Sequence, residues 1–290
     1  MRSAADVAAA AQLACLLEAS APKPGNVSPG RPFGDLRYED FLASAVAIGE
    51  PLAGAGARRL GATILQAIEA TARWTRSNTN LGIVLLVAPL ARAALCTAEA
   101  GGGALRAALR GVLAETNVDD ARDVYAAIRL AAPGGLGRAT EQDVQNDPTV
   151  TLLDAMRLAA DRDGIAREYA DSFEATFEIG APALERARAD GLGWSEAVVE
   201  TFLTLLAAHP DTHIARRGGD ALAAQATHLA AGALAEGGVR STAGLKAIDE
   251  MDRALRDERH HGNPGTTADL TAASIFVVLL GATASGSSAA

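Results

Sequence analysis

Apolar residues recur at helical spacing along most of this 290-residue chain, and this periodicity constrains its fold more than any other feature. Near the N-terminus, Val7, Ala10, Ala14 and Leu17 follow that period, and no segment shows a convincing period-two alternation. Only 4% of residues are aromatic and alanine is abundant, which favours closely packed helices over a β-sandwich. We therefore predict an all-α fold with one compact multi-helix domain over residues 1–282 and a flexible tail at 283–290.

The charge balance limits the classes of partner. The formal net charge of −9 argues against binding to nucleic acid or to anionic membranes, both of which require a basic surface. The longest apolar run, from Leu81 to Leu95, is broken by Pro89 and Arg92 and is shorter than the roughly 18 residues of a membrane span. Both cysteines lie in apolar helical stretches, which predicts two buried thiols in a reducing compartment. We predict a cytoplasmic protein and leave its oligomeric state open, with a homodimer as one candidate.

Polar loops rich in glycine and proline separate the helical segments, at 22–34, 132–148, 209–219 and 260–265. Each loop adjoins a helix start, where free backbone N–H groups bind anions, and each offers an Asn, Asp, Lys or Arg side chain. The aspartates among them are also ordinary helix caps, and Asn78 and Asn80 before the apolar run fit the same role. From local pattern alone, nucleotide binding and simple capping both remain open.

Taken together and in order, five blocks in these loops and before the apolar run change this balance. The sequence resembles the triphosphoribosyl-dephospho-coenzyme A synthase family from about Leu13 to Leu280. The blocks are Pro22-Lys23-Pro24-Gly25, Asn78-Thr79-Asn80-Leu81-Gly82, Gly137-Arg138, Asp211-Thr212 with Arg217-Gly218-Gly219, and Asn263-Pro264-Gly265 with Ala268-Asp269-Leu270. The resemblance implies an all-helical ATP-dependent transferase of coenzyme biosynthesis, which transfers the ribose C1′ of ATP to the 2′-hydroxyl of 3′-dephospho-coenzyme A and releases adenine.

The chain departs from the family pattern at Leu81, where members of the citrate lyase type carry a basic residue. Three alternatives therefore stay open: another coenzyme precursor such as a methanopterin-type pterin as acceptor, a different ribosyl or phosphoribosyl transferase, and a nucleotide-binding protein without catalysis. For the transferase that the resemblance implies, we expect ATP and a coenzyme-type small-molecule acceptor as partners.

Displacement at an anomeric carbon passes through an oxocarbenium-like state, which needs carboxylates for charge and proton transfer and a rigid grip on the triphosphate. We predict Asp211 and Asp143 as catalytic residues, and Asp211, Asp143 and Asp269 as ligands of Mg²⁺, with ATP as substrate. Asp211 follows the end of an apolar helix, where the helix dipole disfavours an acid, whereas capping alone accounts for Asp269. The predicted nucleotide- and phosphate-binding residues are Lys23, Gly25, Asn26, Asn78, Thr79, Asn80, Gly82, Gly137, Arg138, Thr212, Arg217, Gly218, Gly219, Asn263 and Gly265.

Overall fold

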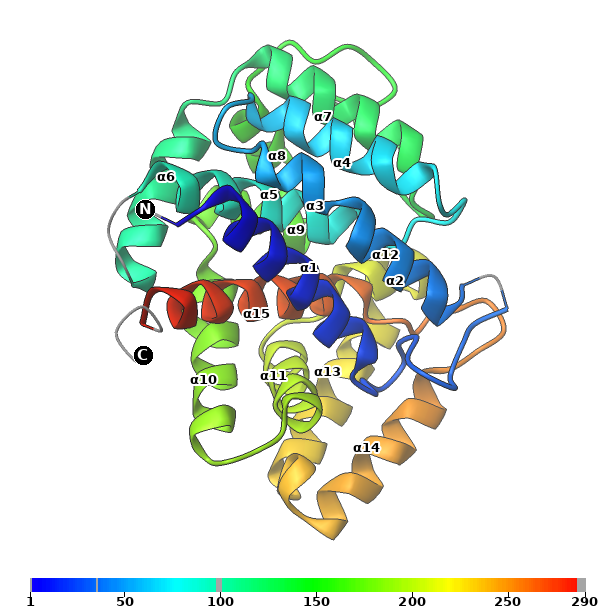
Figure 1. The fold of residues 1–290 in the computed structure, drawn as a ribbon. Coiled ribbons are helices and arrows are strands. Elements are labelled where there is room, and N and C mark those ends of the chain that lie inside the picture. Colours follow the sequence, from blue (N-terminus) through cyan, green and yellow to red (C-terminus); the bar gives the residue numbers. More distant parts are fainter. Residues whose placement is uncertain (1, 35, 98–100, 286–290) are drawn as a thin grey trace.

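Helix α15 (Gly265–Ser285) runs through the middle of the molecule, with packed helices on both sides (Figure 1). It packs against α1 (Ala4–Ser20), α5 (Leu81–Cys96), α11 (Trp194–Ala208) and the π-helix η1 (Ala175–Gly180). This contact set explains its apolar composition. The window Gly265–Ala282 is long and apolar enough to cross a membrane by length and composition alone, and 61% of it is buried inside this fold.

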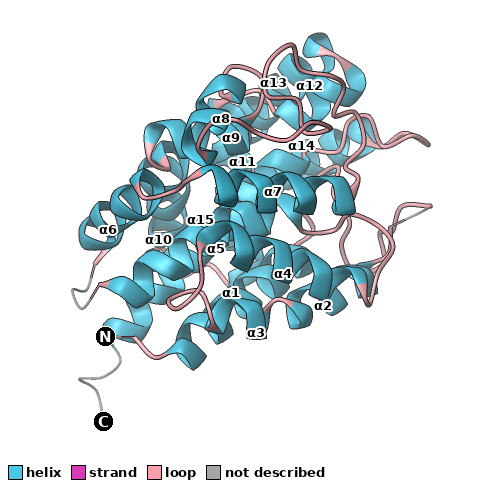
Figure 2. Cartoon of the chain, turned by 90° about the horizontal axis from the view of Figure 1, so that it is seen from above, coloured by secondary structure: helices cyan, strands magenta, loops and turns pink. Residues whose placement is uncertain are grey.

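The computed structural model describes residues 2–34, 36–97 and 101–285. Within these ranges the chain forms helices and loops, with one isolated bridge between Ser28 and Arg31 (Figure 2). The predicted all-α class is confirmed. The remaining elements are α2 (Tyr38–Ala47), α3 (Gly49–Ala53), α4 (Leu60–Ala72), α6 (Gly102–Ala114), α7 (Val118–Ala131), α8 (Leu152–Ala159), α9 (Gly164–Asp171), α10 (Ala181–Ala189), α12 (Thr212–Gly218), α13 (Asp220–Ala235), the 3₁₀ helix η2 (Gly238–Arg240) and α14 (Thr242–Leu255).

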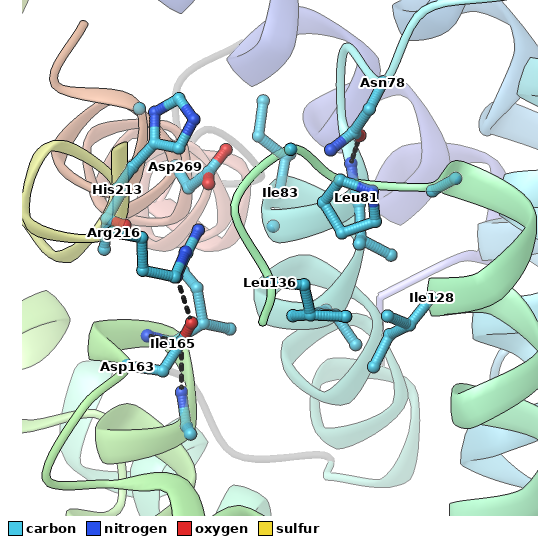
Figure 3. A pocket seen from close by; sticks show the side chains of 18 of the residues that line it. Asn78, Leu81, Ile83, Ile128, Leu136, Asp163, Ile165, His213, Arg216 and Asp269 are labelled. Carbon is cyan, nitrogen blue, oxygen red and sulfur yellow. Dashed lines mark hydrogen bonds and ion pairs between the residues drawn. The ribbon is translucent and has the colours of Figure 1, made fainter. Parts of the chain in front are cut away.

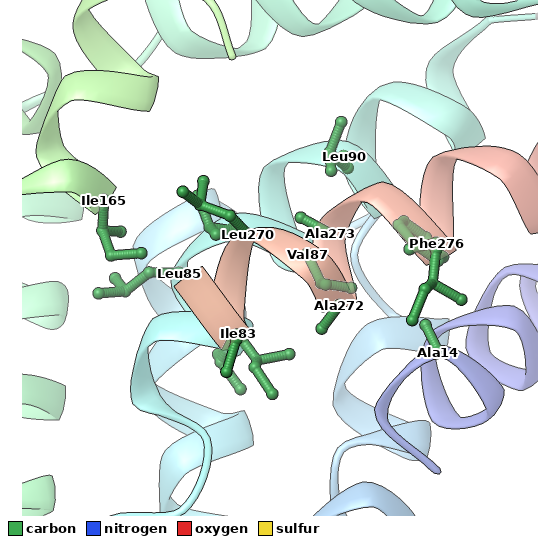
Figure 4. Close-up of a cluster of buried hydrophobic side chains, with 14 of the residues drawn as sticks. Ala14, Ile83, Leu85, Val87, Leu90, Ile165, Leu270, Ala272, Ala273 and Phe276 are labelled. Carbon is green, nitrogen blue, oxygen red and sulfur yellow. The ribbon is translucent and has the colours of Figure 1, made fainter. Parts of the chain in front are cut away.

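The core forms where α15 crosses α1 and α5 (Figure 4). Ala272, Ala273 and Phe276 of α15 are fully buried, as are Val87 of α5 and Ala14 of α1. Small residues on α1 and α15 let the two helix backbones approach closely, and the larger side chains of α5 fill the remaining space. On one side of this centre, α4 packs against α7, and on the other α11, α13 and α14 pack in series.

Several local expectations differ from the structure. The segment expected as a loop at 209–219 contains helix α12, which Asp211 caps. Cys15 is buried as predicted, but Cys96 is exposed at the end of α5, so the expectation of two buried thiols is wrong. Helix α15 continues to Ser285, beyond the boundary expected at 282, and residues 286–290 of the expected tail lie outside the described residues.

Candidate functional site

A cavity of about 600 Å³ lies between the N-terminal ends of α5, α9 and α15, helix α12 and the loop that follows α7. Three helix N-termini thus border one space. Free N–H groups and the positive ends of helix dipoles make such a place suitable for an anionic ligand. Figure 3 shows two unlike ends, with His213, Arg216, Asp163 and Asp269 gathered at one and apolar side chains such as Ile128 and Leu136 at the other.

At the polar end, an ion pair joins α9 to α12. Asp163 caps α9 by accepting hydrogen bonds at Oδ1 from the N–H groups of Ile165 (2.9 Å) and Ala166 (3.1 Å). Its Oδ2 pairs with Nη1 of Arg216 at 2.5 Å. The Nε atom of Arg216 is buried and has no hydrogen-bond partner within the described chain. A ligand oxygen would satisfy this donor, because an unpaired buried donor costs about 1–3 kcal/mol.

Glu18 reaches the same end from the last turn of α1 and is buried. Its Oε1 pairs with Nζ of Lys23 at 2.9 Å, and that ammonium also donates to the carbonyl oxygens of Glu18 and Ala21. The side chain of Lys23 is fully buried and does not line the cavity. The geometry therefore favours Lys23 as the counter-ion of a buried glutamate over Lys23 as a phosphate ligand.

Asp269 faces the cavity from the fifth position of α15, and no hydrogen bond to its side chain is found among the described residues. Burial raises its pKa well above the usual value, and the neighbouring carboxylates of Glu18, Asp211 and Asp163 raise it further, against the opposing effect of Arg216. Gly82 makes room for this carboxyl group, because a Cβ at that position would lie 2.0 Å from Oδ2 of Asp269.

Asp211 has the opposite environment. It is the N-cap of α12, and its Oδ1 accepts a hydrogen bond from the N–H of Ile214 at 2.9 Å. Its Oδ2 accepts from both the N–H and the hydroxyl of Thr267, each at 2.7 Å. The residue is 2% exposed and does not line the cavity. The dipole argument from sequence thus fails, because Asp211 caps the helix that follows it rather than opposing the dipole of the one before.

The Asn78-Thr79-Asn80 segment lines the cavity while also fixing the start of α5. Asn78 accepts a hydrogen bond from the N–H of Leu81 at 3.1 Å, and Asn80 donates from Nδ2 to the hydroxyl of Thr71 at 3.0 Å. The hydroxyl of Thr79 is hydrogen-bonded to that of Ser44. These bonds hold Leu81 and Gly82 at the cavity wall, so the motif positions the helix terminus that borders the site.

The first and last polar loops pack against each other. Gly25 has a φ of +75°, and a Cβ there would lie 2.9 Å from Cδ of Pro264. Its N–H donates to Oδ1 of Asp252 at 2.8 Å. Asn26 is buried against the cavity, and its Nδ2 has no hydrogen-bond partner in the part of the chain that the structure describes. Gly25 is therefore needed for the approach of the two loops, whereas Asn26 has a side chain available to a ligand.

The loop after α7 supplies the outer wall. Asp143 lines the cavity there, and the N–H groups of Gln145 (2.9 Å) and Ala139 (2.7 Å) lower its pKa by donating to the carboxylate. Gly137 lines the cavity in a left-handed conformation, with a φ of +67°, whereas Arg138 is exposed and is not part of the lining.

Helix α12 brings further predicted residues to the wall. Arg217 lines the cavity and donates from Nη2 to the carbonyl of Arg259 at 2.7 Å. The Nδ1 atom of His213 lies 3.1 Å from the carbonyl of Asn263, and burial lowers its pKa. A Cβ on Gly265 would lie 2.5 Å from that nitrogen, so this glycine admits the imidazole.

The structure divides the predicted residues into two groups. Those that line the cavity are Asn26, Asn78, Thr79, Asn80, Gly82, Gly137, Asp143, Arg217, Asn263, Gly265 and Asp269. Those outside its lining are Lys23, Gly25, Arg138, Asp211, Thr212, Gly218 and Gly219. In the second group, Thr212 accepts from the N–H of Gly164 at 3.0 Å, and Gly218 gives space to Leu222. These residues join the helices around the site.

Sequence reasoning missed Glu18 and Asp163 as cavity residues, and it preferred Arg217 to Arg216. A signal for Glu18 was present, because Val7, Ala11 and Ala14 mark the apolar stripe of α1 and Glu18 continues it one turn later. An acid on a buried stripe needs a partner or a function. No comparable signal separates Arg216 from Arg217, since only the direction of α12 decides which one faces Asp163.

No group of three or more His, Cys, Asp or Glu residues suited to a metal ion is present among the residues that could be placed. Asp143, Asp211 and Asp269 therefore do not form a metal-binding cage, because Asp211 is enclosed by its own hydrogen bonds while Asp143 lies on the loop after α7.

Comparisons with known proteins agree on one family. The sequence model of the ATP:dephospho-CoA triphosphoribosyl transferase family matches residues 4–288. A Pseudomonas putida protein provisionally named 2-(5''-triphosphoribosyl)-3'-dephosphocoenzyme-A synthase is 36% identical over 115 residues, 39% of this chain and 40% of its own length. A protein of the same name from Pseudomonas paraeruginosa is 35% identical over 124 residues, 42% of each chain. These alignments thus span less than half of the relatives' lengths.

A solved structure is similar over a larger share. The crystal structure of a protein from Archaeoglobus fulgidus, provisionally described as a triphosphoribosyl-dephospho-CoA synthase, matches with a TM-score of 0.64 and 30% sequence identity. The match covers 83% of this chain and 98% of the other.

Proposed function

Because this chain belongs to the ATP:dephospho-CoA triphosphoribosyl transferase family, we propose that it transfers the triphosphoribosyl group of ATP to 3′-dephospho-CoA. The bond between the ribose C1′ and adenine breaks, and a bond forms between C1′ and the 2′-oxygen of the acceptor. The acceptor hydroxyl loses one proton and the departing adenine gains one. The products are 2′-(5''-triphosphoribosyl)-3′-dephospho-CoA and adenine.

The observation that carries this proposal is the carboxyl group of Asp269 at the polar end of the cavity, which has no hydrogen-bond partner among the described residues. Adenine is a poor leaving group unless it receives a proton as the glycosidic bond breaks, and a general acid contributes roughly 10²–10⁴-fold to such a step. A carboxyl group with a raised pKa holds its proton more tightly than an ordinary aspartate, and among the described residues Asp269 has no hydrogen bond to lose on donating it. Asp269 is therefore the proposed proton donor.

Glu18 is the proposed proton acceptor for the 2′-hydroxyl. It lies at the same end of the cavity and raises the pKa of Asp269, so the two groups interact. One oxygen of Glu18 is paired with the ammonium group of Lys23, which is its buried counter-ion. After each turnover a proton must pass from Glu18 to Asp269, which restores both groups and balances the reaction.

Arg216 and Arg217 are the proposed ligands of the triphosphate, together with the N-terminus of α5. Both arginines line the cavity, and Nε of Arg216 is buried without a partner in the described residues. Magnesium would enter with ATP and neutralise phosphate charge, since it binds through one or two carboxylates plus substrate phosphates. Asp143 is the candidate carboxylate, because its lowered pKa keeps it ionised. The cytoplasmic location and the homodimer stay predictions.

The test is mass spectrometry of the purified protein incubated with Mg-ATP and candidate acceptors. Free adenine together with an adduct of dephospho-CoA is the expected result. Adenine released only with a pterin-type acceptor would move the activity to another coenzyme precursor. Release of pyrophosphate would indicate a phosphoribosyl transfer, and intact ATP with measurable binding would indicate a non-catalytic nucleotide-binding protein.

A further inference from the structure

Three exposed leucines belong to the lining of the cavity. Three of the seven large apolar side chains that are exposed in the described residues line it, namely Leu130 (47% exposed), Leu136 (39%) and Leu158 (48%). They come from the end of α7, the loop after it and the end of α8. A residue that is exposed and also lines a cavity lies at its opening, so these three side chains form an apolar mouth.

Apolar side chains exposed to water at one place are unfavourable, and they usually mark a binding surface. The loop that carries Leu136 lies over the apolar end, and Figure 3 shows Leu136 near Ile128 of α7. Deeper in the cavity the apolar lining continues with buried Leu152 and Met156 of α8. The apolar lining therefore includes exposed residues at the mouth and buried residues further in.

The size of the cavity indicates what crosses this mouth. A volume of about 600 Å³ suits one ligand of ordinary size, whereas the proposed reaction brings two nucleotides together. The 2′-hydroxyl of the acceptor must reach the carboxyl groups at the polar end. The far end of a long acceptor must then leave the cavity at the opposite end, past the three leucines.

We propose that the apolar mouth formed by Leu130, Leu136 and Leu158 binds the uncharged pantetheine arm of the acceptor. This inference rests on the proposed function for the position of the reacting hydroxyl. The arm carries gem-dimethyl and methylene groups between its amides, and these groups gain from contact with leucine side chains. The mouth thus selects for the acceptor and makes no contribution to binding of ATP.

The experiment compares Leu136→Asp and Leu158→Asp with the matched control Leu245→Asp. Leu245 is 53% exposed on α14 and does not line the cavity, so it reports the general effect of placing an acid at an exposed leucine. The mouth variants should raise KM for dephospho-CoA about tenfold or more, which corresponds to loss of one buried leucine contact. KM for ATP and the melting temperature should stay as in the control.

A second measurement separates the mouth from the reaction. Titration calorimetry with 4′-phosphopantetheine, which has the arm but no nucleoside, should show binding to the wild type and loss of binding in both mouth variants. That result without adenine release would support the mouth while contradicting the proposed reaction. Unchanged acceptor KM and unchanged binding of phosphopantetheine would overturn the inference. It would also be overturned by a rise in KM for ATP alone, or by a dimer that the mouth variants dissociate without any change in acceptor KM.

Discussion

Glu168 of α9 and Asp269 of α15 each carry a carboxyl group whose pKa is raised by burial, and the two differ in what surrounds the carboxyl oxygens. Burial raises the pKa of Glu168 to about 7, although the hydroxyl and N–H of Thr176 and the N–H of Ala175 donate to its two oxygens. Asp269 has no such donors among the described residues, and it faces the cavity.

This difference distinguishes a carboxyl group that stabilises the fold from one that can take part in the reaction. Glu168 holds together an irregular turn, in which Ser172 and Phe173 adopt φ values of 60° and 62° before the π-helix begins. Both carboxyl oxygens of Glu168 already accept hydrogen bonds from the protein, whereas those of Asp269 are available to a ligand. A shifted pKa alone therefore does not locate the site, and the hydrogen-bond partners decide between the two regions.

The largest effect on stability is expected for Lys23→Met, which removes the ion-pair partner of the buried Glu18. Glu18 would be left as an uncompensated buried charge, which costs about 3–5 kcal/mol of unfolding free energy. Chemical denaturation measures this loss, and Lys246→Met, at an exposed ion pair, should change stability by less than about 0.5 kcal/mol. If Lys23→Met kept full stability and lost only ATP affinity, Lys23 would be a phosphate ligand after all.

A smaller effect, dependent on pH, is expected from Glu168→Gln. The pKa of Glu168 is about 7 in the fold against an ordinary value of 4.5, so the folded state favours the protonated form. Its contribution to stability is present below pH 4.5 and is lost as the pH rises through 7. Melting temperatures across this range should fall more steeply for the wild type than for Glu168→Gln. Parallel curves would show that Glu168 is ionised in the fold without cost.

The smallest effect is expected from Gly82→Ala, which acts on Asp269 through space alone. The added methyl would lie 2.0 Å from Oδ2 of Asp269, so this carboxyl group must move while the helix persists. A misplaced catalytic group should lower kcat about tenfold or more with little change in melting temperature. Gly111→Ala on α6 is the matched control, since a Cβ there meets no atom within 4 Å. This variant should keep kcat and gain up to about 1 kcal/mol of unfolding free energy. If Gly82→Ala and Gly111→Ala had the same kcat, Asp269 would have no role in turnover.

Helical spacing in the sequence was sufficient to predict the all-α class and the buried helix α5, because that signal is local. The same local logic failed at Asp211. A seven-residue helix such as α12 has too few residues to show a period, so the segment looked like a loop and Asp211 like an acid at the wrong end of α11.

The candidate site was predictable only in part for a related reason. Motif blocks identified the segments that border the cavity, including Gly82 and Asp269. They did not show which side chains face it, because that depends on how α1, α9, α12 and α15 are rotated against each other. Glu18 and Asp163 lie outside every block, and only the packing of these helices brings them to Arg216 and Asp269.

The most direct test of this account measures kcat and melting temperature for Asp269→Asn beside Asp211→Asn. Asp269→Asn keeps the shape of the side chain but cannot donate a carboxylic proton, so kcat should fall roughly 10²-fold or more while the melting temperature stays close to that of the wild type. Asp211→Asn disturbs the bonds to Ile214 and Thr267, so it should lower stability by about 1–3 kcal/mol and leave turnover of the folded protein largely intact. The reverse pattern, with turnover lost at Asp211 and stability lost at Asp269, would contradict the assignment of Asp269 as the proton donor.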